Sequence, residues 1–291
     1  MRQFVFIFFI WFGFFANEGF AQPEEIRKQQ LPVKFNVKNK SLQTVTYLPI
    51  VDSLLPIKTF QLIFHIVQNK DGNGNLTIEN VEHNKFIVMI MNHLNYMYSD
   101  LKPMTLPTTS PLIKDSRVRF YLDFTKGVLY HKDSTLFELK GSNPQYTGGE
   151  ALYKKYVLDK DSTLSYKNAV HIFWCGRGGA YASGIGDGRY VIMSKLLEDF
   201  RLDKRHWWVA GWLAHELGHN LGLNHTFSND GCDDTPLHND CYDGKVCSNN
   251  MMDYNSDLSA LIECQLQKIH FNLMKFNPQA NIFRAVISDI N

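Results

Sequence analysis

The eleven residues from His215 to His225, HELGHNLGLNH, constrain this chain more than any other segment. His215 and His219 are four residues apart, so on a helix their imidazoles project from one face, one turn above the other. The pattern predicts a helix from about residue 204 to residue 221, with Asp203 as its N-cap. Apolar residues on another side of this helix would dock it onto a core: Ala210, Leu213, Leu217 and Leu221.

Two imidazoles at this spacing suit one Zn²⁺ ion, which proteins bind through nitrogen at about 2.1 Å. Gly222 can take the left-handed backbone conformation at a helix end, and the resulting turn brings His225 round as a third ligand. Glu216 points about 100° further round the helix, toward the open metal position. Its carboxylate can take a proton from a zinc-activated water and return it to a leaving amine.

Four short apolar segments predict strands: Gln61–Val67, Val118–Leu122, Ala169–Trp174 and Tyr190–Met193. Apolar residues at helical spacing predict a helix from about Ile78 to Tyr98. Strand, helix and further strands ahead of a long helix predict an α/β (α+β) fold, with a sheet packed on helices. Residues 125–165 have a mixed pattern that predicts no element.

The segment Asp71–Glu82 imitates an EF-hand calcium loop, with oxygen-bearing side chains at most of the expected positions. However, Leu76 stands where that loop requires glycine, and a strand rather than a helix precedes the segment. A strand-to-helix turn is the better interpretation.

The N-terminus predicts export. A short basic start precedes a nearly unbroken apolar run from Phe4 to Phe15, and Gly19-Phe20-Ala21 supplies a cleavage site before Gln22. The run is shorter than the roughly 20 apolar residues that span a bilayer, and an uncleaved N-terminal anchor is the alternative. We therefore expect a signal peptide at 1–21, a stem or short propeptide at 22–57, and a secreted product with no stable membrane span after cleavage.

Export also bears on the five cysteines. Four lie in the last quarter of the chain, and in an oxidising compartment they predict two disulfides: Cys232, Cys241, Cys247 and Cys264. The residues alone allow three pairings. No C-x-x-C pair is present, which argues against a structural zinc cluster. Cys175 stands apart and is expected to be a buried free thiol.

The motif from His215 to His225 resembles the extended zinc motif of the metzincin peptidases, H-E-x-x-H-x-x-G-x-x-H, at every specified position. That group also has a Met-turn, which Asn249-Asn-Met-Met-Asp-Tyr254 resembles. The resemblance implies that Met252 forms the floor of the zinc site and that Tyr254 stabilises the oxyanion. The residues after the third histidine and the N-x-M-D-Y form of the turn are most similar to the pappalysin family.

This resemblance implies a metzincin-like twisted sheet with an active-site helix, followed by a disulfide-stapled C-terminal subdomain that contains the Met-turn. The catalytic domain would span 58–291, with an upper part to about 222 and a lower part over 223–291. In the pappalysin family the cysteines that flank the Met-turn form crossed disulfides. The resemblance therefore implies the pairs Cys232–Cys247 and Cys241–Cys264.

Further properties of some relatives enter as expectations. Some prefer a basic side chain just after the cleaved bond, and Asp257 lies in the region of the acid that selects it. Residues 22–170 contain no cysteine, so latency through a propeptide cysteine is excluded. Calcium is an open expectation for the loop after the third histidine, which contains Asp230, Asp233 and Asp234.

The leading hypothesis is a secreted zinc endopeptidase whose protein or peptide substrate lies along an edge strand within 180–185. The alternative is a non-catalytic secreted zinc-binding or adhesion protein. A pore-forming toxin is a third hypothesis, but no amphipathic insertion segment supports it. The net charge of +1 over 291 residues shows none of the basic excess of nucleic-acid-binding proteins.

The remaining histidines are weaker candidates for the site. His65 and His171 are expected to be core or cleft residues, because both fall inside strands. Three others have no ligand partner at useful spacing: His206, His238 and His270. Neither the substrate nor the oligomeric state follows from the sequence.

Overall fold

The structure, a computed structural model, describes residues 57–139, 144–160, 166, 169–177, 179–183, 188–202, 205–236, 238, 248–254 and 257–275. They belong to the larger of the two units into which the chain divides, Thr46–Asn291. The predicted signal peptide at 1–21 and all but the last residue of the predicted stem at 22–57 lie outside the described residues.

A mixed sheet runs through this unit, with strand order β2-β1-β4-β6-β5. The long strand β1 (Lys58–Gln68) pairs in parallel with β2 (Val118–Leu122) along its first half and with β3 (Val128–Lys132) along its second half. On its other side it pairs in parallel with β4 (Val170–Cys175), which pairs with β6 (Tyr190–Ser194). The short edge strand β5 (Tyr181–Ala182) is antiparallel to β6.

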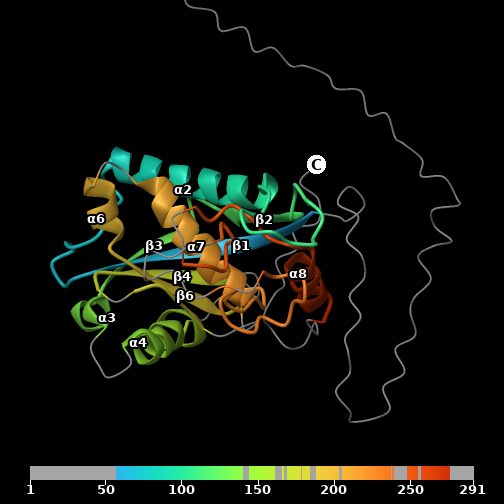
Figure 1. Cartoon of the computed structure of the whole chain (residues 1–291). Helices are drawn as coiled ribbons and strands as arrows, with labels where there is room; N and C mark the ends of the chain where they lie inside the picture. Colours follow the sequence, from blue (N-terminus) through green and yellow to red (C-terminus); the bar gives the residue numbers. More distant parts are fainter. Residues whose placement is uncertain are drawn as a thin grey trace, which may run out of the picture. The chain divides into compact units, whose positions relative to one another are not determined.

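Helices cover both faces of the sheet (Figure 1). On one face lie α2 (Val81–Ser99) and α7 (His206–Asn220), which share an apolar core with the sheet. On the other lie α3 (Ser134–Glu138), α4 (Pro144–Tyr153) and the π-helix η1 (Lys154–Leu158). Two further helices are α6 (Leu196–Arg201) and α8 (Glu263–Lys275). The predicted α/β fold is therefore confirmed.

The four predicted strands and the first predicted helix are present, and no end differs from its predicted position by more than three residues. The segment between Asp71 and Glu82 is a strand-to-helix turn, and Asn80 caps α2 by accepting from the Glu82 N–H at 2.9 Å. The Glu82 carboxylate, which an EF-hand would use as a ligand, instead pairs with Lys85 Nζ at 2.8 Å. None of the described helices combines the length and the apolar character that crossing a bilayer requires.

The start of α7 differs from the prediction. Arg205 occupies the N-cap position without a side-chain cap, and its carbonyl accepts from the N–H groups of Trp208 and Val209. The predicted cap, Asp203, lies two residues earlier and outside the described residues. An unpredicted helix, α6, precedes this start and runs to Arg201.

The predicted pairs Cys232–Cys247 and Cys241–Cys264 are wrong, because Cys232 is bonded to Cys264. The physical reason is the position of α8, whose first turn packs against the loop after the third histidine and leaves the two Cα atoms 5.7 Å apart. The Cys264 N–H also donates to the Asp234 carboxylate at 3.4 Å. Cys241 and Cys247 lie outside the described residues. Cys175 is a buried free thiol, as predicted, and burial raises its pKa.

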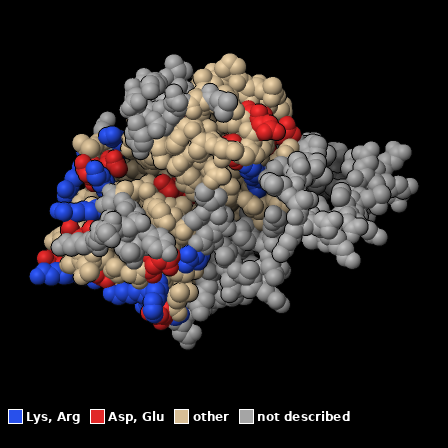
Figure 2. Space-filling view, turned by 60° about the horizontal axis from the view of Figure 1, so that its bottom comes forward, with Lys and Arg blue, Asp and Glu red and all other residues tan. Residues whose placement is uncertain are grey.

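Charged side chains of both signs are interspersed on the face of the molecule that Figure 2 shows, and a broad area of that face carries neither sign. This mixture agrees with the near-zero net charge of the sequence.

Candidate metal centre and its cleft

Three imidazoles from α7 and the turn after it converge on one point. His215 and His219 lie on consecutive turns of the helix, and His225 follows the reversal of the chain. Its Nε2 lies 3.1 Å from the Nε2 of each of the other two rings. One nitrogen from each ring falls within 4.8 Å of the others, which makes this a group able to hold a metal ion.

Backbone carbonyls orient two of these rings. His215 Nδ1 lies 2.7 Å from the Met251 carbonyl and His219 Nδ1 lies 2.8 Å from the Leu223 carbonyl. A carbonyl only accepts, so each Nδ1 donates and each Nε2 presents its lone pair to the centre. Three ring nitrogens meeting with at most one proton among them repel one another unless a cation lies between them. The donor set therefore fits a zinc ion.

The local environment keeps these rings neutral. Burial lowers the pKa of His215 to about 3 and that of His225 to about 4, and charge repulsion from His219 adds to the effect in both. Burial also lowers the pKa of His219. Neutral imidazole is the form that binds a metal, so at pH 7 no proton has to be displaced from any of the three.

Two glycines permit the close packing of this centre. Gly222 has φ +101°, in the region that favours glycine, and turns the chain toward His225. Gly218 was missed in the sequence analysis. A Cβ built on it would lie 2.4 Å from Met252 Sδ, so the fully buried Met252 side chain packs directly against the bare backbone of α7.

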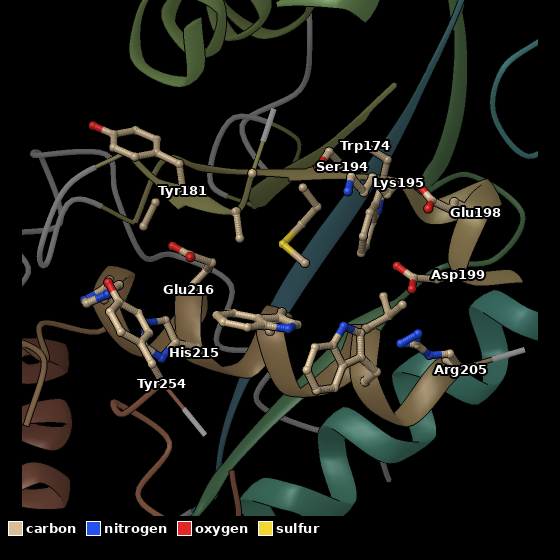
Figure 3. Close-up of a pocket in the computed structure, with 18 of the residues that line it drawn as sticks. Trp174, Tyr181, Ser194, Lys195, Glu198, Asp199, Arg205, His215, Glu216 and Tyr254 are labelled. Atoms are coloured by element: carbon tan, nitrogen blue, oxygen red, sulfur yellow. The ribbon is translucent and has the colours of Figure 1, made fainter. Parts of the chain in front are cut away.

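Glu216 points from α7 into the cleft, toward the edge strand that carries Tyr181 (Figure 3). Burial raises the pKa of its carboxyl to about 8, and a hydrogen bond from the Ala182 N–H acts in the opposite direction. Its side chain is therefore held between the helix of the histidines and strand β5. A carboxyl poised near neutrality suits proton transfer in both directions.

The Met-turn lies beneath the histidines and is held by a polar network that sequence analysis missed. The fully buried Asp253 carboxylate accepts from His238 Nε2 at 2.6 Å, from Ser248 Oγ at 2.7 Å and from the Tyr254 N–H at 2.8 Å. His238, which was predicted to have no ligand partner, thus bonds the turn rather than a metal. The ring of Tyr254 lies 4.8 Å from that of His225.

The metal centre opens into a cavity of about 900 Å³. At one end lie the three histidines, Glu216 and Tyr254. The cavity continues along α7 past Trp212 and Trp208, over Trp174 of β4, and ends at α6 (Figure 3). Its opposite rim is the segment Gly179–Ala182, so the predicted edge strand does border the site, although residues 184–187 lie outside the described residues.

Other predicted site residues lie elsewhere. Asp257 is exposed and does not line the cavity. In the loop after His225, the Lys268 ammonium bonds the Asp230 carbonyl, and its charge acts on both Asp230 and Asp234. In this loop, where a calcium ion was an open expectation, Lys268 therefore supplies a positive charge beside Asp230 and Asp234.

A second group of histidines lies on the opposite face of the sheet. His65 bonds His131 at 2.8 Å and His171 at 2.9 Å, and His171 Nε2 bonds the Tyr166 carbonyl at 3.0 Å. The prediction that His65 and His171 are core residues is confirmed, since both are fully buried. His131, from the unpredicted strand β3, was missed.

Comparison with known proteins gives two findings. Residues 179–286 match the model of the peptidase M43 family, described as pregnancy-associated plasma protein-A. This segment contains the three histidines, Glu216 and the Met-turn. No curated protein matches the chain significantly.

The fold is similar to that of Tannerella forsythia mature mirolysin in complex with a cleaved peptide. The TM-score is 0.51 at 15% identity, over 78% of this chain and 94% of that chain. Mirolysin in complex with compound 9 gives 0.50 at 16%, over 74% and 91%. A Tannerella forsythia promirolysin mutant gives 0.50 at 14%, over 78% and 83%. The predicted resemblance to the pappalysins is confirmed, and the fold is mirolysin-like.

Proposed function

We propose that this chain is a metallopeptidase of the M43 (pappalysin) family, and that it acts as a secreted zinc endopeptidase with Glu216 as its general base. The match of residues 179–286 to the model of that family supports this proposal. The observation that carries the proposal is the convergence of three histidine Nε2 atoms beside a buried carboxyl in an open cleft. At two of these rings a backbone carbonyl accepts from Nδ1 and so fixes the tautomer in which Nε2 is free to bind a metal.

A zinc ion bound by His215, His219 and His225 would polarise the scissile carbonyl and lower the pKa of a water ligand. Glu216 takes a proton from the attacking water at its carboxylate and then delivers it to the leaving amine. Tyr254 donates its phenolic hydrogen to the oxygen that gains negative charge. Met252 supports the histidines from below through its contact with Gly218.

The substrate backbone adds to the edge strand β5, whose outer side borders the cavity. This strand also holds Glu216 through the Ala182 N–H, so a peptide paired with β5 lies beside the general base. The substrate class is peptide bonds in proteins or extended peptides, because an edge strand recognises the peptide backbone itself.

Secretion is supported by two independent features. The apolar run near the N-terminus has the length and flanks of a signal peptide. The Cys232–Cys264 disulfide is of the kind that persists in oxidising compartments. The proposed domain limits are a signal peptide at 1–21, a stem or propeptide at 22–57 and the catalytic domain at 58–291.

The test compares the wild type, Glu216→Ala and a control, Glu79→Gln, all beginning at Gln22. Casein cleavage and zinc content after dialysis are measured for each. Glu216→Ala should lower cleavage by about 100-fold or more and keep one zinc per chain. Glu79 is exposed on the turn before α2, so its variant should match the wild type.

A chelator separates this function from its alternative. An endopeptidase loses cleavage on chelation and regains it with added zinc. A non-catalytic zinc-binding protein shows no cleavage at any pH, and chelation lowers only its melting temperature. Full activity in Glu216→Ala would refute the assigned role of the carboxylate.

A further inference from the structure

The cavity extends well beyond the metal centre along one face of α7. Trp212 and Trp208 precede His215 by three and seven residues, so all three side chains lie along the same side of the helix. At 1.5 Å per residue, Trp208 is about 10 Å from His215 along the axis. Both indoles line the cavity, with ring centroids 5.9 Å apart in an edge-to-face arrangement.

The sheet supplies an apolar floor opposite these indoles. Trp174 of β4 is fully buried and Met193 of β6 is 4% exposed, and both line the cavity. Val209 adds to the wall from α7. Trp174, Met193 and Val209 belong to the core, and Trp212 packs against it. This end of the cavity is therefore bounded on two sides by apolar groups, with the partly exposed Trp208 on the side of α7.

At the end of the cavity away from the three histidines, the charged side chains are equal in number for each sign. Four charged side chains line it, two basic and two acidic: Lys195, Glu198, Asp199 and Arg205. The Arg205 guanidinium lies over the Trp208 ring, 5.6 Å from its centroid, and its charge also acts on the half-buried Asp199 carboxyl. In Figure 3 Asp199 and Arg205 stand together at the end of the cavity away from Glu216.

This arrangement disfavours a basic substrate side chain. A cation would need an aromatic face or a carboxylate, and Arg205 already lies over the Trp208 ring and acts on the Asp199 carboxyl. Lys195 and Glu198 are both exposed at the rim, and their opposite charges leave no net negative charge there. Asp257, the acid expected to select a basic side chain, is exposed and does not line the cavity.

We propose that this end of the cavity is the subsite for a large aromatic side chain beside the scissile bond, with Trp208 as a specificity-determining residue. The inference rests on the proposed endopeptidase function and names its substrate class. An aromatic ring would lie among Trp174, Trp208 and Trp212, where edge-to-face contacts with indoles favour it over a small side chain.

The test uses the zinc-loaded chain from Gln22 onward and matched peptides that differ only at one residue flanking the scissile bond. Phe, Ala, Arg and Glu are placed in turn on either side, and kcat/KM is measured for each peptide. The wild type should cleave the Phe peptide at least about tenfold faster than the Ala and Arg peptides at one of the two positions.

Three variants and one control test whether Trp208 and Arg205 set the preference for an aromatic side chain. Trp208→Ala should lower the ratio of kcat/KM for the Phe peptide to that for the Ala peptide by about tenfold, whereas Trp208→Phe should retain most of this ratio. Trp207→Ala is the matched control, because Trp207 is 47% exposed and does not line the cavity. Arg205→Ala should raise the relative rate of the Arg peptide by exposing the Trp208 face and the Asp199 carboxylate.

Each outcome decides the proposal. A wild type that cuts the Arg peptide fastest, or a Phe-to-Ala ratio that Trp208→Ala leaves intact, overturns the subsite while the endopeptidase function stands. A zinc-loaded protein that cleaves neither these peptides nor casein overturns both.

Discussion

Gly222 is the residue at which the backbone leaves least choice. Its φ of +101° would strain the backbone of any residue other than glycine. A Cβ added there would also lie 1.8 Å from Asn272 Nδ2, which donates to the Leu221 carbonyl at 3.1 Å. The turn to His225 therefore depends on this position both locally and through α8.

Gly222→Ala should lower the free energy of unfolding by about 1–3 kcal/mol and weaken zinc binding, because strain at the turn displaces His225. Urea denaturation and a zinc titration measure the two effects. Gly211→Ala, inside α7, is the control. A Cβ there meets nothing nearer than Leu258 Cδ1 at 3.8 Å, and alanine favours a helix by about 1 kcal/mol. Equal stability of Gly222→Ala and the wild type would contradict the strain.

At the scale of elements, the metal centre requires two segments to hold each other. Helix α7 carries His215, and the Met-turn supplies the Met251 carbonyl that orients its ring. Asp253 fixes this turn by accepting from His238, Ser248 and the Tyr254 N–H. His238 Nδ1 also lies 2.8 Å from the Pro236 carbonyl, so both nitrogens of the ring have a partner in this network.

Asp253→Ala should destabilise the protein by about 3–5 kcal/mol, because the His238 ring, the Ser248 hydroxyl and the Tyr254 N–H all lose their acceptor. It should also reduce zinc affinity, since the Met251 carbonyl loses its fixed position. Ser248→Ala removes one neutral donor to the same carboxylate and should cost only about 1 kcal/mol. Thermal unfolding with and without zinc distinguishes the two variants. A smaller loss for Asp253→Ala than for Ser248→Ala would show that the network does not hold the turn.

Helices and strands were predicted correctly where their own apolar residues recur at the spacing of a helix or a strand. The strand at Val118–Leu122 was predicted to the residue, because its alternating burial is a local property. Helix α6 is only six residues long, which is too short for a helical period to be recognised, and it was missed.

At the scale of the whole molecule, the sheet separates two groups of histidines with different surroundings. One faces the cleft, and the other is the chain His131–His65–His171 beneath α4 and η1. Burial lowers the pKa of all three rings in this chain, well below 6.5 for His65, to about 3 for His171 and to about 4 for His131. Lys155 and Lys160 lower the pKa of His131 further, whereas Asp133 raises it.

These lowered pKa values predict loss of stability in acid. An unfolded histidine titrates near 6.5, so below that pH the unfolded chain binds protons that the folded chain does not. The stability is fully present above pH 6.5 and falls as pH drops toward the folded pKa values. The slope is about 1.4 kcal/mol per pH unit for each ring that stays neutral.

His171→Phe should flatten this slope between pH 6.5 and 5, measured by urea denaturation with chelator present so that zinc release does not contribute. The phenyl ring keeps the aromatic contacts of the site and removes the titrating group. His206→Gln, at the start of α7 and outside the chain of rings, is the control. An unchanged pH dependence in His171→Phe would show that the buried rings do not set the acid limit.

The sequence by itself predicted the three histidines that converge, the resemblance to the pappalysins and the succession of strands. These depend on helical spacing, a glycine turn and periodic burial, which are properties of neighbouring residues. Only the tertiary structure decided that Cys232 pairs with Cys264, that His238 supports the Met-turn, and that tryptophans rather than Asp257 line the cleft. Each of these three features depends on contacts between residues that are far apart in the sequence. Their contacts depend on how the helices pack on the sheet, and that packing is not encoded in the spacing of any one segment.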